Sequence, residues 1–181
     1  MGYTAENQIA ISNALQSQAL RQPETNNYLM NTSFRFMLNK TPKITYFCQR
    51  ANVPDFSLEG IEQPVRYGAR VFKAGDKYNY GDLQISFLVD ENMENYLEMH
   101  DWLRSCANLK DTKEFEGREK FTSGADLYIL NSNLRVIKTV RFTDVIPTSL
   151  GAINFDSTNS DTEPIVVDAT FKFTHYDILP E

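Results

Sequence analysis

GDKYNYGDLQISFLVDENMENYLEMHDWLRSC, residues 75–106, is the stretch that decides the expected fold. Within it, residues 83–89 alternate along the chain in the manner of a half-buried strand. Asp90 is the expected start of a helix, with Glu91 and Glu94 where carboxylates favour the positive end of the helix dipole. The helical spacing predicts a buried stripe of Met93, Tyr96, Leu97, His100, Leu103 and Cys106, widened by Met99 and Trp102. The stretch therefore predicts a turn, a strand and an amphipathic helix, and it contains no catalytic pattern.

Strand patterns account for most of the remaining sequence. Residues 34–38 alternate apolar and polar side chains, and a turn containing Pro42 leads to a second expected strand at 44–50, which together predict an antiparallel hairpin. The last third predicts a hairpin turning at 131–133, a strand from Arg135 toward Pro147, a short strand at 152–155 and a final strand at 165–173. The predicted fold class is mainly β: a β-sandwich or partly closed barrel flanked by one α-helix.

The N-terminal residues differ from the rest in composition. Residues 4–22 are rich in Ala, Gln, Ser and Leu, and they predict a helix with Thr4 as N-cap and Pro23 as stop. The apolar stripe of this helix is thin, so the helix needs a surface to pack on. We therefore expect two parts, an N-terminal helical arm at 1–27 and a β-sandwich domain at 28–181.

Residues 55–79 have a weak pattern that Pro64, Gly68 and Gly75 interrupt. We expect a long loop here, with an edge strand at 61–67. The segment has a local excess of positive charge in an acidic protein, and long loops are more often functional than idle. We therefore expect a contact with a neighbouring subunit. The interface candidates are Arg66, Tyr67, Arg70, Phe72, Lys73 and Lys77.

Composition argues against several functional classes. The 181 residues suit one domain, and a net charge of −6 lacks the basic surface that a sequence-reading nucleic-acid binder needs. Cys48 and Cys106 are expected to be free thiols, and neither they nor His100 and His175 have metal-ligand spacing. We expect both histidines to pack against the core. The loop at 156–161 lacks the glycine and the distal glutamate of an EF-hand.

Catalytic patterns are missing from the sequence. A nucleophile system and a phosphate-binding glycine loop both lack their required residue patterns, so we expect no catalytic residues, no cofactor and no metal. The chain begins without the basic and apolar segments of a secretory signal and has no long apolar run. We therefore expect a protein that is made in the cytosol and does not insert into a membrane.

Segments along most of the chain, in the same order, resemble the tail tube proteins of T-even-like contractile-tailed phages. They are FRFML at 34–38, TYFCQRANVP at 45–54, VFKAGD at 71–76, the strand at 83–89, the helix ending in DWL at 101–103, FTDVIPTSL at 142–150 and DATFKFTHYD at 168–177. The likeness covers residues 27–178, and the ordered set of segments, rather than any one of them, carries it.

The resemblance implies a β-sandwich that forms hexameric rings, which stack into a tube with the sheets joined into a barrel around the lumen. It implies that DNA passes through an acidic lumen without specific binding. It further implies a contractile sheath, a baseplate and tail terminator proteins as partners, and a place in the virion tail after assembly in the host cytoplasm.

The first functional prediction is the repeating subunit of the tail tube. Because the arm before Asn27 is longer than a plain tube subunit leads one to expect, a baseplate-proximal tube initiator or a tail junction protein of the same fold is the alternative. A ligand-binding β-sandwich is a third alternative, and its only support is the group of aromatic residues Tyr67, Phe72, Tyr78 and Tyr80.

Overall fold

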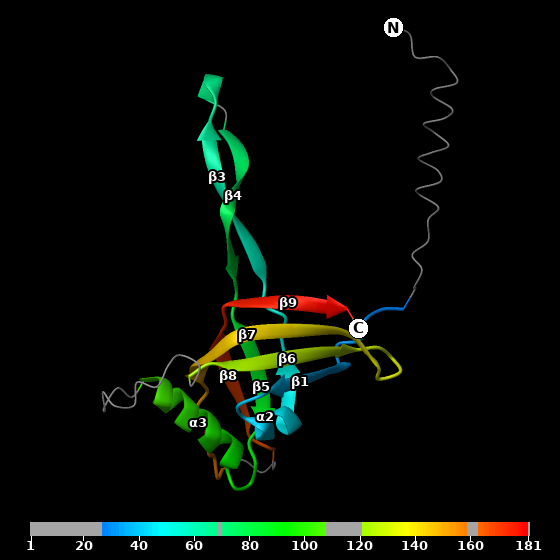
Figure 1. The fold of residues 1–181 in the computed structure, drawn as a ribbon. Coiled ribbons are helices and arrows are strands. Elements are labelled where there is room, and N and C mark those ends of the chain that lie inside the picture. Colours follow the sequence, from blue (N-terminus) through cyan, green and yellow to red (C-terminus); the bar gives the residue numbers. More distant parts are fainter. Residues whose placement is uncertain (1–26, 69, 108–120, 159–162, 181) are drawn as a thin grey trace. The chain divides into compact units, whose positions relative to one another are not determined.

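The computed structural model describes residues 27–68, 70–107, 121–158 and 163–180 (Figure 1). The chain divides into the units Met1–Met30 and Asn31–Glu181, and the second holds all the helices and strands of the described residues. The predicted arm at 1–27 lies almost wholly outside the described residues.

The described elements are mainly strands. In chain order they are β1 (Phe34–Leu38), α2 (Pro42–Phe47), β2 (Cys48–Ala51), β3 (Phe56–Pro64), the 3-10 helix η1 (Arg66–Gly68), β4 (Arg70–Tyr80), β5 (Leu83–Leu88), α3 (Glu94–Ala107), β6 (Ser123–Leu130), β7 (Val136–Leu150), β8 (Val166–Lys172) and β9 (His175–Pro180). Every strand pair is antiparallel. The predicted mainly β class, with a helix following the 83–89 strand, is confirmed.

Seven strands form one sheet in the order β1-β6-β7-β8-β5-β2, with β9 paired to β7. Strand β7 changes partners along its length: Lys138–Thr143 pairs with β9, and Ile146–Leu150 pairs with β8. Asp144 lies between these two parts in the left-handed region, with φ of 56°. Its carboxylate accepts a hydrogen bond from Thr174 Oγ1 at 3.3 Å, which helps to hold the bend. Aspartate tolerates this conformation better than most residues.

The core is one cluster of buried side chains contributed by β1, α2, β5, α3, β6, β7 and β8. Strands β5 and β8 pair Leu83 with Phe171, Ile85 with Ala169 and Phe87 with Val167, and all six side chains are buried. The alternation predicted at 83–89 and 165–173 is therefore confirmed. Trp102 of α3 packs on Phe171, with ring centroids 6.0 Å apart. The helix is thereby fixed to one face of the sheet (Figure 1).

The buried face of α3 differs from the predicted stripe. Its buried residues are Asn95, Met99 and Trp102, whereas Leu97 and His100 are exposed. The helix begins at Glu94 and not at Asp90, because Asp90–Met93 forms a turn closed by a 2.8 Å bond from Met93 N to Asp90 O. Within the helix, polar Asn95 takes a place on the buried face, which an apolar pattern does not predict. The stripe that packs on the core is therefore rotated relative to the predicted one.

Three further strand predictions are wrong. Most of the segment 44–50 is helix α2, because Pro42 is favoured in a first helical turn and Ile44 is buried on one side. Strand β1 pairs with β6 and β2 with β5, so the predicted hairpin between them does not form. Residues 152–155 are not a strand. The predicted final strand at 165–173 agrees with β8, and the separate strand β9 follows it.

Candidate assembly surface

The segment predicted as a long loop, 55–79, is in fact a β-hairpin. Strands β3 and β4 pair only with each other in the described structure, from Phe56 opposite Tyr80 to Pro64 opposite Arg70. In Figure 1 they run side by side as a ribbon of their own beyond the seven-stranded sheet. Nearly all their described residues are exposed. The loop prediction failed because a ribbon exposed on both faces shows no burial period.

One face of this hairpin carries a row of large apolar side chains. Residues directly opposite each other in an antiparallel pair share a face. The pairs Phe56–Tyr80 and Leu58–Tyr78 lie in one row, and Phe72, opposite Glu62, continues it. We name four exposed members the hairpin strip: Phe56, Leu58, Phe72 and Tyr78, whose exposed fractions are 58%, 51%, 68% and 54%.

The opposite face is polar near the base of the hairpin. Ser57 lies directly opposite Asn79, and its hydroxyl donates to the Asn79 carbonyl at 3.4 Å. The Asn79 amide donates to Glu59 Oε1 at 3.0 Å. Near its base the hairpin is therefore two-faced, and the apolar face there has the character of a surface that a partner covers. Farther from the base, Ile61 and Val71 are exposed on the opposite face.

The base of the hairpin is joined to the sheet by an aromatic cluster. The Tyr80 ring lies 5.4 Å from Phe56, 5.5 Å from Phe173 and 5.0 Å from Tyr176, measured between ring centroids. Phe173 in turn packs on the buried Phe142 at 5.2 Å. A continuous path of aromatic contacts thus leads from the core to the hairpin strip.

Polar contacts support the same junction. Gly81 N donates to Asp55 O at 2.9 Å, which closes the open end of the hairpin. The Asn52 amide donates to Asp82 O at 3.0 Å, and Lys172 forms an ion pair with the Asp82 carboxylate. Both strands that leave the sheet are therefore tied to it where the hairpin begins.

All six predicted interface residues lie on this hairpin. Arg66 and Tyr67 belong to η1, between the two strands, and Arg70, Phe72, Lys73 and Lys77 lie on β4. Arg70 Nη1 is bound to Glu62 Oε2 at 2.7 Å, so its charge is already paired within the hairpin. The role of the six residues in a subunit contact stays a prediction. Sequence reasoning missed Phe56 and Leu58, although their alternation with Ser57 and Glu59 is a strand signal.

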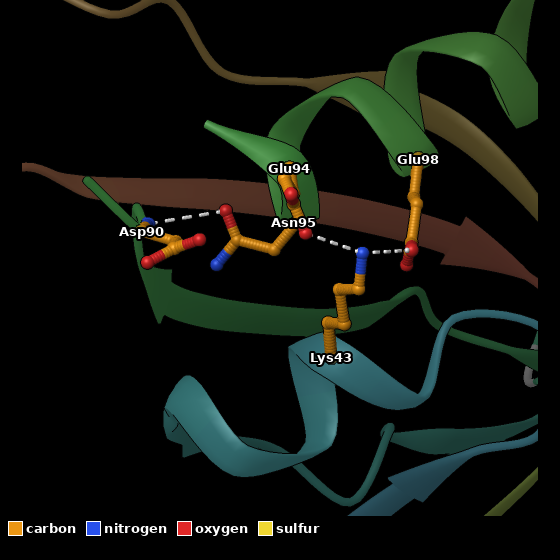
Figure 2. A network of polar contacts seen from close by, with 5 residues as sticks. All are labelled: Lys43, Asp90, Glu94, Asn95 and Glu98. Atoms are coloured by element: carbon orange, nitrogen blue, oxygen red, sulfur yellow. Dashed lines mark hydrogen bonds and ion pairs between the residues drawn. The ribbon is translucent and has the colours of Figure 1, made fainter. Parts of the chain in front are cut away.

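A second polar network connects the two helices (Figure 2). Lys43 Nζ of α2 lies 2.6 Å from Glu94 Oε2 and 3.0 Å from Glu98 Oε1 of α3. The hydrogen bonds that Lys43 donates to Glu94, the larger effect, and to Glu98 raise the pKa of Lys43, and the bond from Lys43 lowers the pKa of Glu94. The fully buried Asn95 donates to Leu88 O at 2.7 Å and accepts from Asp90 N at 3.2 Å. This network is structural, because it fixes the start of α3.

The two cysteines and two histidines were expected to have no catalytic or metal-binding role. Cys48 and Cys106 are free, as predicted. Burial raises the pKa of Cys48 to about 11 and also raises the pKa of Cys106, so both remain thiols at neutral pH.

His100 and His175 are exposed, so their predicted packing against the core is wrong. The described residues contain no group of three His, Cys, Asp or Glu side chains that could hold a metal ion. The loop at 156–161 lies partly outside the described residues.

Comparison with known proteins gives the family. Residues 6–179 match the model of the phage tail tube protein family. The chain belongs to this family. The resemblance predicted from the sequence is therefore confirmed, and the protein is a structural component of the phage tail and not an enzyme. No helix of the described residues is both long and apolar enough to cross a membrane.

Individual relatives of this tail tube family member come from several contractile systems. The tail tube terminator protein of Enterobacteria phage T4 is 25% identical over 175 residues, covering 93% of this chain and 94% of the relative. The tube terminating cap of the anti-feeding prophage has a TM-score of 0.65 and 17% identity, covering 88% of this chain and 96% of the other. A chain of the PVC sheath-tube complex, from an extracellular contractile injection system, has a TM-score of 0.63 and 15% identity, covering 92% and 97%. The two structural likenesses show a shared fold.

Proposed function

We propose that this chain forms the ring that terminates the tail tube, which is the tail junction alternative stated above. The observation that carries the proposal is the likeness to the T4 tail tube terminator protein, because it covers 93% of this chain and 94% of that protein. The structural likeness to the tube terminating cap of the anti-feeding prophage supports the same role. The repeating tube subunit is the second candidate, supported by the likeness to the sheath-tube complex.

A terminator binds the last ring of the tube through one surface and offers no equivalent surface for a further ring. The β3–β4 hairpin suits the first task. Arg66, Lys73 and Lys77 place exposed cations on it, in a protein whose net charge is −6. Such cations favour contact with an acidic surface on a tube subunit. The proposal includes a hexameric ring and passage of DNA through its lumen, as the resemblance to tail tube proteins implies.

The ligand-binding alternative rested on Tyr67, Phe72, Tyr78 and Tyr80. Of these, Phe72, Tyr78 and Tyr80 lie on one face of the hairpin. Tyr80 is occupied by the aromatic cluster at the base. Exposed aromatic side chains in a row are typical of protein contacts.

The test uses tail tubes still attached to baseplates, assembled from the tube protein of the same phage. The full chain, with a C-terminal tag, is added, and gold particles against the tag are located by negative-stain microscopy. We expect gold at the tube end distal to the baseplate. In addition, tubes treated with the chain should no longer lengthen when fresh tube protein is supplied.

Other positions of the gold would contradict the proposal. Gold along the whole tube would identify a repeating subunit, and gold at the baseplate end would identify an initiator. Untagged chain with the same gold reagent is the control for unspecific binding. Tubes that keep lengthening after treatment would also overturn the termination role.

A further inference from the structure

The described structure exposes a second apolar feature, in the turn between β6 and β7. Leu134 has an exposed fraction of 74% and a φ of 59°. A bulky residue in this left-handed region is strained, and such strain persists only where the surroundings hold it. The sequence places a leucine here, where glycine would remove the strain. The turn therefore presents an apolar side chain to solvent at an energetic cost.

Asn131 holds this turn in place. Leu134 N donates to Asn131 O, and the Asn131 side-chain oxygen accepts from the backbone N–H groups of Asn133 and Arg135, each at 2.9 Å. Asn131 N also donates to Arg135 O at 2.9 Å. We name residues Asn131–Arg135 the Leu134 turn. Because its backbone is so well bonded, the turn presents Leu134 in one defined position.

The Leu134 turn and the base of the hairpin lie at opposite ends of the segment of β7 that pairs with β9. Near one end, Phe142 of β7 pairs with Tyr176 of β9, which contacts Tyr80 at the base of the hairpin. Near the other end, Lys138 pairs with Pro180, and the chain then reaches the turn. Figure 1 shows β7 and β9 running between these two ends. At about 3.4 Å per residue, the six residue steps of β7 from Phe142 to Val136, where the turn ends, span roughly 20 Å.

Two different surfaces on one chain are what a head-to-tail contact requires. A ring closes when each copy gives one surface to the next copy and receives the other from the previous one. A surface that paired with itself would stop at a dimer. The placement of the Leu134 turn and the hairpin strip therefore fits a ring.

The charges around the two surfaces are opposite. In the half of the hairpin next to the sheet, residues 55–59 and 74–80, three carboxylates (Asp55, Glu59 and Asp76) stand against one lysine (Lys77). Residues 131–138 contain two cations, Arg135 and Lys138, and no carboxylate. Complementary charges at the rim of an apolar contact steer association and favour one register.

We infer that the Leu134 turn of one copy packs on the hairpin strip of the next copy around the ring, with Leu134 against Phe56, Leu58 and Tyr78. Arg135 then lies beside the half of the hairpin that carries the three carboxylates. The inference rests on the proposed function, because it assumes that the chain forms a ring of its own copies. It leaves the basic tip of the hairpin available to the tube.

The test compares two variants of the full chain, each with a matched control. Leu134→Asp is compared with Ser132→Asp in the same turn. Tyr78→Asp is compared with Ser57→Asp, which lies on the opposite face of the hairpin. Circular dichroism and thermal unfolding establish that each variant is folded. Sedimentation velocity and negative-stain microscopy then measure ring formation over a range of concentrations.

We expect each of the two test variants to need at least about tenfold more protein than the wild type for half assembly, because a carboxylate would be buried without a partner. The two controls should assemble like the wild type. An equal mixture of Leu134→Asp and Tyr78→Asp should stop at dimers. Each such pair has one intact Leu134 turn facing one intact strip, and its other two surfaces both carry a carboxylate.

Different results separate this inference from the proposed function. Rings formed normally by Leu134→Asp, or full rings from the mixture, would overturn the contact while leaving tube termination in place. A mixture that does not associate at all, although the wild type forms rings, would also overturn it. A wild type that neither forms rings nor binds tube ends would overturn the proposed function, and the inferred contact with it.

Discussion

The ring of Phe72 lies over the backbone of Gly60 on the neighbouring strand, so closely that a Cβ atom on Gly60 would be 1.7 Å from Phe72 Cζ. Gly60 lies opposite Ala74, two residues along β4 from Phe72, so the ring reaches diagonally across the hairpin. A glycine within a strand normally weakens it. Here the missing side chain makes room for the Phe72 ring to lie against the backbone, although Phe72 as a whole stays largely exposed.

We expect Gly60→Ala to loosen the hairpin. Alanine ordinarily stabilises a strand by about 0.5–1 kcal/mol relative to glycine, but here its methyl group would displace the Phe72 ring. Backbone amides of 56–64 and 70–80 should therefore exchange hydrogen faster in the variant. The control is Gly60→Ala in a Phe72→Ala background, where the same change should be neutral or stabilising. Equal exchange rates in Gly60→Ala and wild type would contradict the role of this contact.

The second prediction concerns Tyr80, which connects the hairpin to the sheet. Tyr80→Ala removes its contacts with Phe56, Phe173 and Tyr176, and we expect a loss of about 2 kcal/mol in the free energy of unfolding. Urea unfolding followed by fluorescence measures this loss. Tyr46→Ala is the matched control, since Tyr46 is largely exposed and should change the free energy by less than about 0.5 kcal/mol. Similar losses in the two variants would show that Tyr80 does not anchor the hairpin.

The sequence predicted those strands whose side chains alternate between core and solvent. Residues 83–89 and 165–173 belong to strands that pair with each other over a buried face, so their burial and their pattern agree. The turn at 131–133 was also predicted correctly, because Asn-Ser-Asn is typical of turns. In these segments local pattern and tertiary packing favour the same structure.

The failed predictions have tertiary causes. The helix α2 is short, and its buried residue Ile44 fits a strand pattern equally well. The hairpin at 56–80 is exposed on both faces, so its side chains show no alternation between core and solvent. The face of α3 was misplaced because polar Asn95 is buried, which an apolar pattern does not reveal. The assembly candidates were chosen mainly because their segment has an excess of positive charge. Phe56 and Leu58 were missed because they carry no charge.

Asn95 gives the third prediction. Its amide spans the connection between β5 and α3, bonded to Leu88 O and Asp90 N. Asn95→Ala leaves these backbone groups without the partner they have now, and we expect a loss of about 1–3 kcal/mol in the free energy of unfolding. Chemical denaturation measures it. Asn92→Ala, a change of the same kind at an exposed residue of the same connection, should lose much less. A loss as small as that of Asn92→Ala would remove Asn95 from this role.

The fourth prediction is a pH dependence that arises from the contact between α2 and α3. The pKa of Glu94 is lowered, so its contribution to stability is complete above the ordinary glutamate pKa of about 4.3 and is lost as the pH falls through the lowered value. The pKa of Lys43 is raised, so its contribution is complete below the ordinary lysine pKa of about 10.4 and is lost as the pH rises through the raised value.

Lys43→Met should therefore differ in thermal midpoint from the wild type near neutral pH and lose that difference toward both extremes. The difference should be small and should shrink in high salt, because the ion pairs are exposed. Thermal scans from acid to alkaline pH measure it. Glu94→Gln keeps the second partner, Glu98, and should give an intermediate result. A difference that does not change with pH would assign the effect of Lys43 to packing of its aliphatic chain.

The last prediction separates the two arginines near the tip of the hairpin. Arg70 is bound to Glu62 at 2.7 Å, so Arg70→Glu would bring two carboxylates together and disturb the hairpin itself. Arg66→Glu changes the charge of the tip and should leave the free energy of unfolding within about 0.5 kcal/mol of the wild type. We expect Arg66→Glu to bind tube ends more weakly, with a smaller dependence on salt, because an attractive charge contact is lost. Arg66→Lys keeps the charge and should bind nearly as the wild type does. If Arg66→Glu caps tubes as well as the wild type at low salt, the tip of the hairpin does not face an acidic surface of the tube.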